Sequence, residues 1–358
     1  MDLSLSEDQQ TLRTAFAEFF DKEATVDRVR AAEPLGFDQD LWAKLAGTGA
    51  VAMGLPEEAG GGGATNLDLA LVAEQYGRRL APVPFVECAA AGAILAAADA
   101  TDLLDGVADG STLPTLALSP PRDGRLPLVP AGAVAEIVVA LDGDRLIALR
   151  REPGPRPRPH VAASPNFGSS PLADWSLTDG ERIELAAGPR AVQLYQDGVS
   201  QWKLLTGAAL GGLRASALEL GVSYVKARKA FGVIIGSFQA IQHRLADLVV
   251  AGDGAQLLVY EAAWARDTGQ PEAAALASMA FLFNADTAFR TTRECLQFHG
   301  GYGVTLEYDI QLYFRRAKAW PLALGDPKLE YRRLADVIYP DRPQLEDTGP
   351  ENAEQEEE

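Results

Sequence analysis

Cysteine, histidine and methionine are scarce in this chain of 358 residues, which contains two cysteines, three histidines and three methionines. Cys88 and Cys295 are too few to build a disulfide framework. The three histidines, His160, His243 and His299, show no paired-ligand spacing. We therefore expect a reduced protein with no metal site.

Long apolar runs and a surplus of basic residues are also missing. No apolar run reaches the roughly 18 residues of a membrane span. Asp2, Glu7 and Asp8 stand where a secretory signal would be basic and then apolar. The net charge is -18, with 32 basic and 50 acidic residues, which argues against nucleic-acid binding. The sequence predicts a cytoplasmic protein that binds neither membrane nor nucleic acid.

Hydrophobic residues make up 47% of the chain, enough for a sizeable core, and the length predicts two or three domains. The first hundred residues have helical periodicity. Ser6 and Gln9 form a capping-box pattern before an apolar face, and a third helix is expected to run from Asn66 to a stop at Gly77. We assign residues 1–108 to an N-terminal helical domain.

Residues 109–190 are richer in proline and glycine and contain short strand-like segments. Val134–Leu141 and Arg145–Leu149 flank Asp142-Gly143, a strong hairpin signal. We therefore expect a small, reduced β domain between the two helical parts of the chain.

Long helices return after this region, and we expect them over Ala191–Lys229, Phe238–Asp267 and Pro271–Phe298. Residues 191–342 are thus predicted to form a C-terminal helical bundle, followed by an acidic, disordered tail at 343–358. The predicted fold class is mainly α with a small β domain.

Two motifs stand at the ends of the long helices. The first is Arg228-x-x-Phe231-Gly232, followed by a new helix that begins near Ser237. An arginine and an aromatic side chain at such a break could hold an anionic, planar cofactor. Taken alone, an arginine such as Arg228 is more often part of a surface ion pair.

The second motif is Gln297-x-x-Gly300-Gly301, some sixty residues further on. Glycines after a helix let backbone amides approach a ligand closely. A simple glycine stop explains the same pair of residues when it is considered alone.

Together the two motifs resemble the acyl-CoA dehydrogenase family. The resemblance extends to Leu3–Gln9, to Trp42 and Leu45, and to Leu55–Gly61, and it is weak between about 105 and 190. It implies a helical domain, a β domain and a four-helix C-terminal domain, with FAD bound at a dimer interface.

The resemblance also implies roles for single residues. Arg228 and Phe231 would contact the pyrophosphate and adenine end of an FAD held mainly by the neighbouring subunit. Gln297 and Gly301, next to Gly300, would reach across to the same FAD. Gln239 would assist at the start of the following helix.

The sequence departs from the family at the catalytic base. The glutamate expected nine residues after Arg316 is replaced by Gly325. Some members carry the base on the preceding long helix, and the equivalent position here is Asp286. An aspartate can remove a proton α to a thioester carbonyl, although its arm is one methylene shorter. Asp286 is the candidate base. The alternative is that Asp286 is only a polar residue on the rim of its helix.

The flavin-ring stretches of the family's β domain are also missing. This combination is similar to the short subunits of heterotetrameric acyl-CoA dehydrogenases, including those that act on steroid side chains. The resemblance implies an α2β2 complex with a second acyl-CoA dehydrogenase-like chain, a bulky acyl-CoA substrate, a trans-2-enoyl-CoA product, and an electron-transfer flavoprotein as acceptor. The alternatives are a non-catalytic structural subunit and a flavin-dependent oxidase or hydroxylase.

Overall fold

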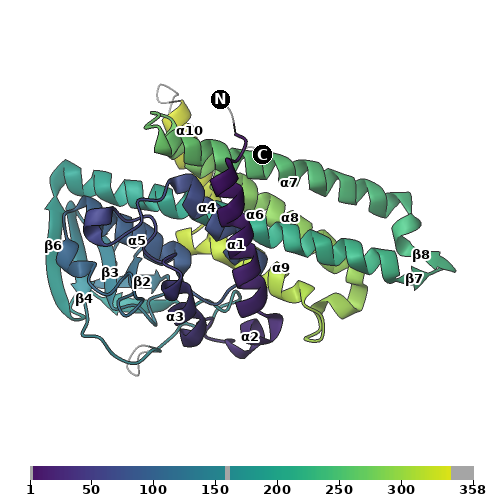
Figure 1. Cartoon of the computed structure of the whole chain (residues 1–358), viewed down its shortest axis with the longest axis horizontal. Coiled ribbons are helices and arrows are strands. Elements are labelled where there is room, and N and C mark those ends of the chain that lie inside the picture. Colours follow the sequence, from purple (N-terminus) through teal and green to yellow (C-terminus); the bar gives the residue numbers. More distant parts are fainter. Residues whose placement is uncertain (1–2, 158–161, 340–358) are drawn as a thin grey trace, which may run out of the picture.

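The computed structural model describes residues 3–157 and 162–339. Along the chain, helices precede and follow a small β region (Figure 1). The strands lie at one end of the molecule, and long helices extend from them to the opposite end. The predicted fold class, mainly α with a small β region, is confirmed. The predicted acidic tail at 343–358 lies outside the described residues.

The N-terminal helices follow the sequence signals closely. Ser6 caps the first helix with the predicted capping box, which it forms with Gln9. The third predicted helix begins at Asn66 but runs through Gly77 to Arg78. The helices of this region are α1 (Glu7–Glu23), α2 (Val26–Ala31), α3 (Gln39–Gly47), α4 (Asn66–Arg78) and α5 (Phe85–Ala97).

The β region contains a four-stranded sheet in the order β1-β3-β4-β6 and a separate pair, β2-β5. The predicted hairpin is β3–β4, in which Asp142 pairs with Arg145, so the turn consists of Gly143 and Asp144. Gly143 has a φ of 64°, which a glycine adopts without strain. The strands are β1 (Pro114–Leu116), β2 (Arg125–Val129), β3 (Ile137–Asp142), β4 (Arg145–Arg150), β5 (Ala173–Ser176) and β6 (Glu181–Ala187).

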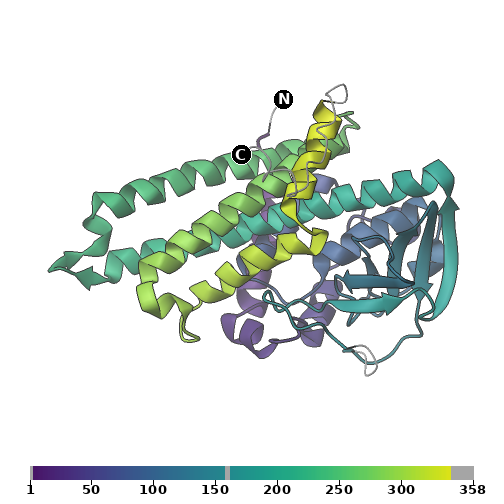
Figure 2. The ribbon, with the colours of Figure 1, turned by 180° about the vertical axis from the view of Figure 1, so that it is seen from behind.

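The C-terminal bundle is built on α6, a helix of 40 residues that spans most of the molecule (Figure 2). It begins directly after β6, because Gly188 and a proline at its first turn start the helix three residues before the predicted position. The helices are α6 (Gly188–Ala227), α7 (Gln239–Asp267), α8 (Ala273–His299), α9 (Ile310–Ala319) and α10 (Pro327–Ile338).

One continuous apolar core joins the three regions. It includes Trp42 from the N-terminal helices, Val139 from the sheet, and Leu205 and Phe281 from the bundle. Because α6 contributes to this core and continues beyond it, its far end carries the next turn away from the sheet (Figure 1). In residues 3–157 and 162–339, we find no helix with the length and apolar character that a membrane crossing requires.

Candidate functional site

The turn after α6 presents an apolar side chain to solvent. Two short strands, β7 (Lys229–Ala230) and β8 (Val233–Ile234), pair around Phe231 and Gly232. Phe231 is 94% exposed and has a φ of 55°, which is strained for a residue with a side chain. A phenylalanine held open in this way costs free energy unless another molecule covers it.

The following helix, α7, begins at Gln239 with its first backbone N–H groups open. Its N-cap residue, Phe238, provides no side-chain cap among the described residues. Gln239 itself is exposed. The N-terminus of a helix of 29 residues carries a partial positive charge, so this end favours an anion.

The second motif forms the end of α8. Gly300 leaves the helix with a φ of 61°, and a Cβ added at Gly300 or Gly301 would meet no atom within 4 Å. Gln297 is exposed, and its carbonyl accepts the backbone N–H of Gly300. The Gly300 amide is thus paired within the turn, while the open space around both glycines leaves room for a ligand.

Aromatic contacts hold the two motifs side by side. The Tyr224 ring on α6 stacks on His299 with centroids 4.0 Å apart, and the Arg228 guanidinium lies 5.9 Å from the Tyr302 ring centroid. The Nδ1 of His299 lies 2.7 Å from the Cys295 carbonyl oxygen, and burial lowers the pKa of this histidine. The structure thus brings Arg228 and the Gly300–Gly301 turn together from distant parts of the sequence.

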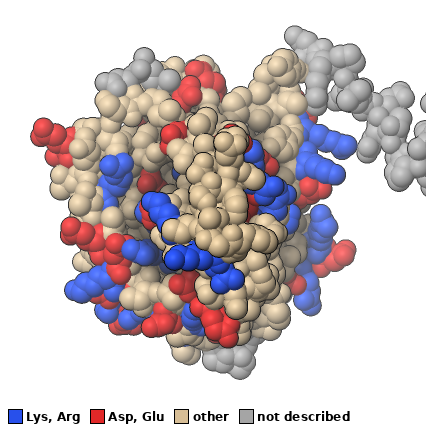
Figure 3. Space-filling view, turned by 90° about the vertical axis from the view of Figure 1, so that its right-hand side faces the viewer, with Lys and Arg blue, Asp and Glu red and all other residues tan. Residues whose placement is uncertain are grey.

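Positive charge gathers at this end of the molecule. Lys226, Arg228 and Lys229 are exposed, and no ion pair within the described residues holds Arg228. Figure 3 looks at this end and shows blue side chains around a tan centre. An unpaired arginine, open amides and an exposed ring together suit a phosphate-bearing, planar ligand. We call the surface of Arg228, Phe231, Gln239, Gln297, Gly300 and Gly301 the anion-facing surface.

Asp286 lies apart from this surface. It is exposed on α8, about 13 residues before His299, which corresponds to roughly 20 Å along the helix. The pKa of Tyr331 on α10 is raised mainly by burial and, to a smaller extent, by the negative charge of Asp286. Asp286 is thus a solvent-facing carboxylate of α8, and its role as a base stays a prediction.

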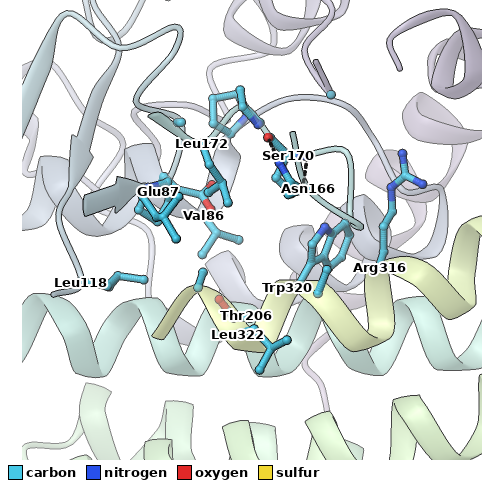
Figure 4. Close-up of a pocket in the computed structure, with 18 of the residues that line it drawn as sticks. Val86, Glu87, Leu118, Asn166, Ser170, Leu172, Thr206, Arg316, Trp320 and Leu322 are labelled. Carbon is cyan, nitrogen blue, oxygen red and sulfur yellow. Dashed lines mark hydrogen bonds between the residues drawn. The ribbon is translucent and has the colours of Figure 1, made fainter. Parts of the chain in front are cut away.

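A cavity of about 440 Å³ lies between the N-terminal helices, the β region and α6 (Figure 4). Leu322 and Gly325 line it, so the segment that takes the place of the expected base loop forms part of its wall. That segment contributes no carboxylate to the cavity. Tyr76, Trp202, Trp320 and Leu118 contribute much of its apolar lining.

Glu87 is the lining residue that the sequence analysis missed. It lies in the first turn of α5 and is the one acidic side chain among the described residues that line the cavity. Burial raises the pKa of Glu87, although its own backbone N–H and the nearby Trp202 indole favour the charged form. A single acidic residue within the apolar stretch Phe85–Ala91 is the signal that could have revealed it.

Known proteins resemble this chain along most of its length. Residues 6–101 match the family described as acyl-CoA dehydrogenase, N-terminal domain, and residues 193–338 match acyl-CoA dehydrogenase, C-terminal domain. Acyl-CoA dehydrogenase IpdE2 of Mycolicibacterium smegmatis is 32% identical over 94% of this chain and its own full length. IpdE2 of Mycobacterium tuberculosis is 33% identical over 93% of this chain and 98% of its own.

Solved structures share the fold. The Tcur3481-Tcur3483 steroid ACAD G363A variant matches with a TM-score of 0.82 and 26% identity, over 94% of this chain and 99% of its own. The ChsE4-ChsE5 complex from Mycobacterium tuberculosis matches with a TM-score of 0.81 and 25% identity, over 96% of this chain and 100% of its own.

Proposed function

Because this chain belongs to the acyl-CoA dehydrogenase family, we propose that it is the short subunit of a heterotetrameric, FAD-dependent acyl-CoA dehydrogenase. The anion-facing surface carries this proposal, since its open amides and unpaired arginine form half of a dinucleotide site. The relatives named as a complex, ChsE4-ChsE5, and as a steroid ACAD support a heteromer that acts on a bulky acyl-CoA.

The residues of the anion-facing surface fit the pyrophosphate and adenine end of FAD. Arg228 would donate charge-assisted hydrogen bonds to the diphosphate, with the open Gly300–Gly301 turn beside it. Phe231 would stack on the adenine, which explains why the chain holds this ring in solvent at a positive φ. Gln239 and Gln297 would donate further hydrogen bonds from the two helix ends.

Bound FAD supplies the hydride acceptor for oxidation of an acyl-CoA to a trans-2-enoyl-CoA. In this reaction a carboxylate must take the proton from the carbon next to the thioester carbonyl. Gly325 cannot do so, and we keep Asp286 as this chain's candidate base, with the partner chain as the other possible source. The expected electron acceptor is an electron-transfer flavoprotein, and the expected compartment is the cytoplasm.

A structural subunit without chemistry of its own is the second candidate function. It is favoured by the absence of a carboxylate in the 322–325 segment and by the exposure of Asp286. The test is Asp286→Asn in the assembled complex, with Asp336→Asn on an exposed part of α10 as a matched control. Loss of turnover with normal FAD content supports the base; unchanged turnover supports the structural role.

A further inference from the structure

A smaller cavity, of about 160 Å³, lies among α4, α6, α7 and α8, and we call it the four-helix cavity. It shares no lining residue with the larger cavity beside Leu322 and Gly325. Polar side chains from all four helices line it: Glu74, Arg78, Arg214, Gln256, Tyr260 and Asn284. Sites for drug-sized ligands run from roughly 300 to 1,000 Å³, so this cavity suits a molecule of only a few non-hydrogen atoms.

Two buried side chains of this wall have polar atoms without partners. Arg214 is 8% exposed, and its Nε–H finds no acceptor within the described residues. Asn284 is fully buried; its Nδ2 donates to the carbonyl oxygens of Ala255 and Ala280, but its Oδ1 accepts no hydrogen bond there. Each unpaired buried group costs about 1–3 kcal/mol. The wall therefore lacks one acceptor, for Arg214, and one donor, for Asn284.

Gly211 shows that these two groups lie close together. A Cβ on Gly211 would stand 3.1 Å from the Asn284 Oδ1. Gly211 precedes Arg214 by three residues on α6, so the two positions share one face of the helix, about 5–6 Å apart. One small molecule in the cavity can thus contact both Arg214 and Asn284.

The fold also keeps a place for the arginine on α7. A Cβ on Gly252 would stand 1.9 Å from the Arg214 Nη1, so only a glycine leaves room for the guanidinium. A glycine inside a helix is less stable than an alanine by about 1 kcal/mol. The buried arginine is retained despite this loss, although no ion pair in residues 3–157 and 162–339 holds it.

The charges around the four-helix cavity favour a neutral ligand. Glu74 lines the wall, and its Oε2 accepts hydrogen bonds from Gln256 and Tyr260. Burial lowers the pKa of Arg214, while the nearby charges of Asp253 and Glu74 act in the opposite direction. The charge of the arginine is therefore partly compensated, and an anion placed beside it would also meet the Glu74 carboxylate.

We propose that the four-helix cavity binds a small, neutral carboxamide. The carbonyl oxygen of the amide accepts the Nε–H of Arg214, and its N–H donates to the Oδ1 of Asn284. A ketone of the same size lacks the donor, and a carboxylate lacks the donor and carries a charge. Arg228 lies 14 residues after Arg214 on α6, about 21 Å at roughly 1.5 Å per residue, so this site is distinct from the cofactor half-site.

The test uses acetamide, acetone and acetate, which have nearly the same size and shape. Ligand-observed NMR titrations on the full chain in its purified assembly give the three dissociation constants. The wild type should bind acetamide about tenfold more tightly than either acetone or acetate, the effect of one or two hydrogen bonds. Arg214→Met removes the donor and should reduce this preference to about twofold or less.

Gly211→Ala should have the same effect, because its methyl group fills the space beside the Asn284 Oδ1. Two matched controls should keep the full preference. Arg332→Met removes an exposed arginine that does not line the cavity. Gly47→Ala adds a methyl group to a helix where it meets nothing within 4 Å.

Three results would overturn the proposal. They are equal or tighter binding of acetate by the wild type, an unchanged acetamide preference in Arg214→Met, and no saturation by acetamide below roughly 100 mM, as expected of a cavity that holds only water. Circular dichroism shows whether each variant folds, and Asn284→Leu replaces Gly211→Ala if the latter does not. FAD content of the same samples separates the two hypotheses: absent FAD with an intact acetamide preference contradicts only the proposed function.

Discussion

Among single residues, Arg228 carries the largest share of the proposed cofactor contact. Arg228→Gln should weaken FAD binding by the assembled complex by about tenfold or more, because it removes charge-assisted hydrogen bonds to a diphosphate. The measurement is the bound FAD per complex at increasing dilution. Lys226→Gln removes another exposed charge nearby and should have a much smaller effect. Equal loss in both variants would mean that only general charge matters.

The buried carboxyl of Glu87 predicts a pH-dependent stability. Its pKa is raised by burial above the ordinary value of 4.5, so the folded state resists its ionisation. Below pH 4.5 the protonated carboxyl costs the folded state nothing. As the pH rises through the raised pKa, the folded state loses stability relative to the unfolded chain, in which the carboxyl ionises freely. Glu87→Leu should therefore stabilise the protein at pH 7 and do so less near pH 4.

Thermal unfolding of the wild type and of Glu87→Leu, at pH 7 and near pH 4, measures this difference in stability. A stability difference that is the same at pH 4 and pH 7 would show that Glu87 does not ionise with a raised pKa. Glu58→Leu is the control, because it removes an exposed carboxylate.

At the level of helices and strands, the close contact between α4 and α6 depends on Gly77. A Cβ at Gly77 would lie 1.9 Å from the Ala209 carbonyl oxygen of α6. Gly77→Ala should therefore push the helices apart and destabilise the protein by about 3 kcal/mol. Gly47→Ala is the matched control: it also lies in a helix, but its Cβ would meet nothing within 4 Å. Urea unfolding of both variants measures the difference; equal effects would refute the close-contact explanation.

The link between the α2 region and α9 depends on Glu33. Burial opposes ionisation of Glu33, but Arg316 and Arg315 outweigh it, so its pKa lies below the ordinary 4.5. The Arg315 Nη2 donates to it at 2.6 Å, and the Arg316 side chain is only 3% exposed. Glu33→Gln should cost about 2 kcal/mol at pH 7, because it leaves a buried arginine poorly paired.

The cost of Glu33→Gln should shrink as the pH falls. A lowered folded-state pKa provides stability above the unfolded value of about 4.5, and this stability is lost as the pH drops through the folded pKa. Urea titrations at pH 7 and near pH 4 measure the gap between wild type and variant. A gap that does not narrow at low pH would contradict the ion pair's role.

The elements themselves were largely predictable, because their signals are local. The capping box at Ser6 and the hairpin at Gly143 depend on neighbours within a few residues. The capping box was found where expected, and the hairpin turn lies one residue later than predicted. Gly77 was predicted to stop a helix, yet α4 continues to Arg78. The glycine is needed instead for a close contact with α6, and a partner helix more than a hundred residues away leaves no local signal.

The candidate site was only half predictable for the same reason. Each of the two motifs, at Arg228 and at Gly300, is a short continuous stretch of sequence that can be recognised by itself. The structure places the two side by side. The cavity is assembled from the N-terminal helices, the β region, α6 and α9. Glu87 belongs to it only through folding, so periodicity alone could not single it out.

For the whole molecule, the anion-facing surface is open and one-sided. The β7–β8 turn, which carries the exposed Phe231, lies at the end of the bundle opposite the sheet of β3, β4 and β6 (Figure 1). In the proposed function, this arrangement would provide contacts for a cofactor that another chain holds. The chain alone should therefore bind FAD poorly, and the assembled complex should bind it well.

Co-expression with an acyl-CoA dehydrogenase-like partner tests this claim most directly. The mass, subunit ratio and bound FAD of the purified complex are compared with those of the chain expressed alone. We predict an α2β2 complex that contains FAD and oxidises an acyl-CoA, and an isolated chain with little or no FAD. An isolated chain that is saturated with FAD and active by itself would contradict the account.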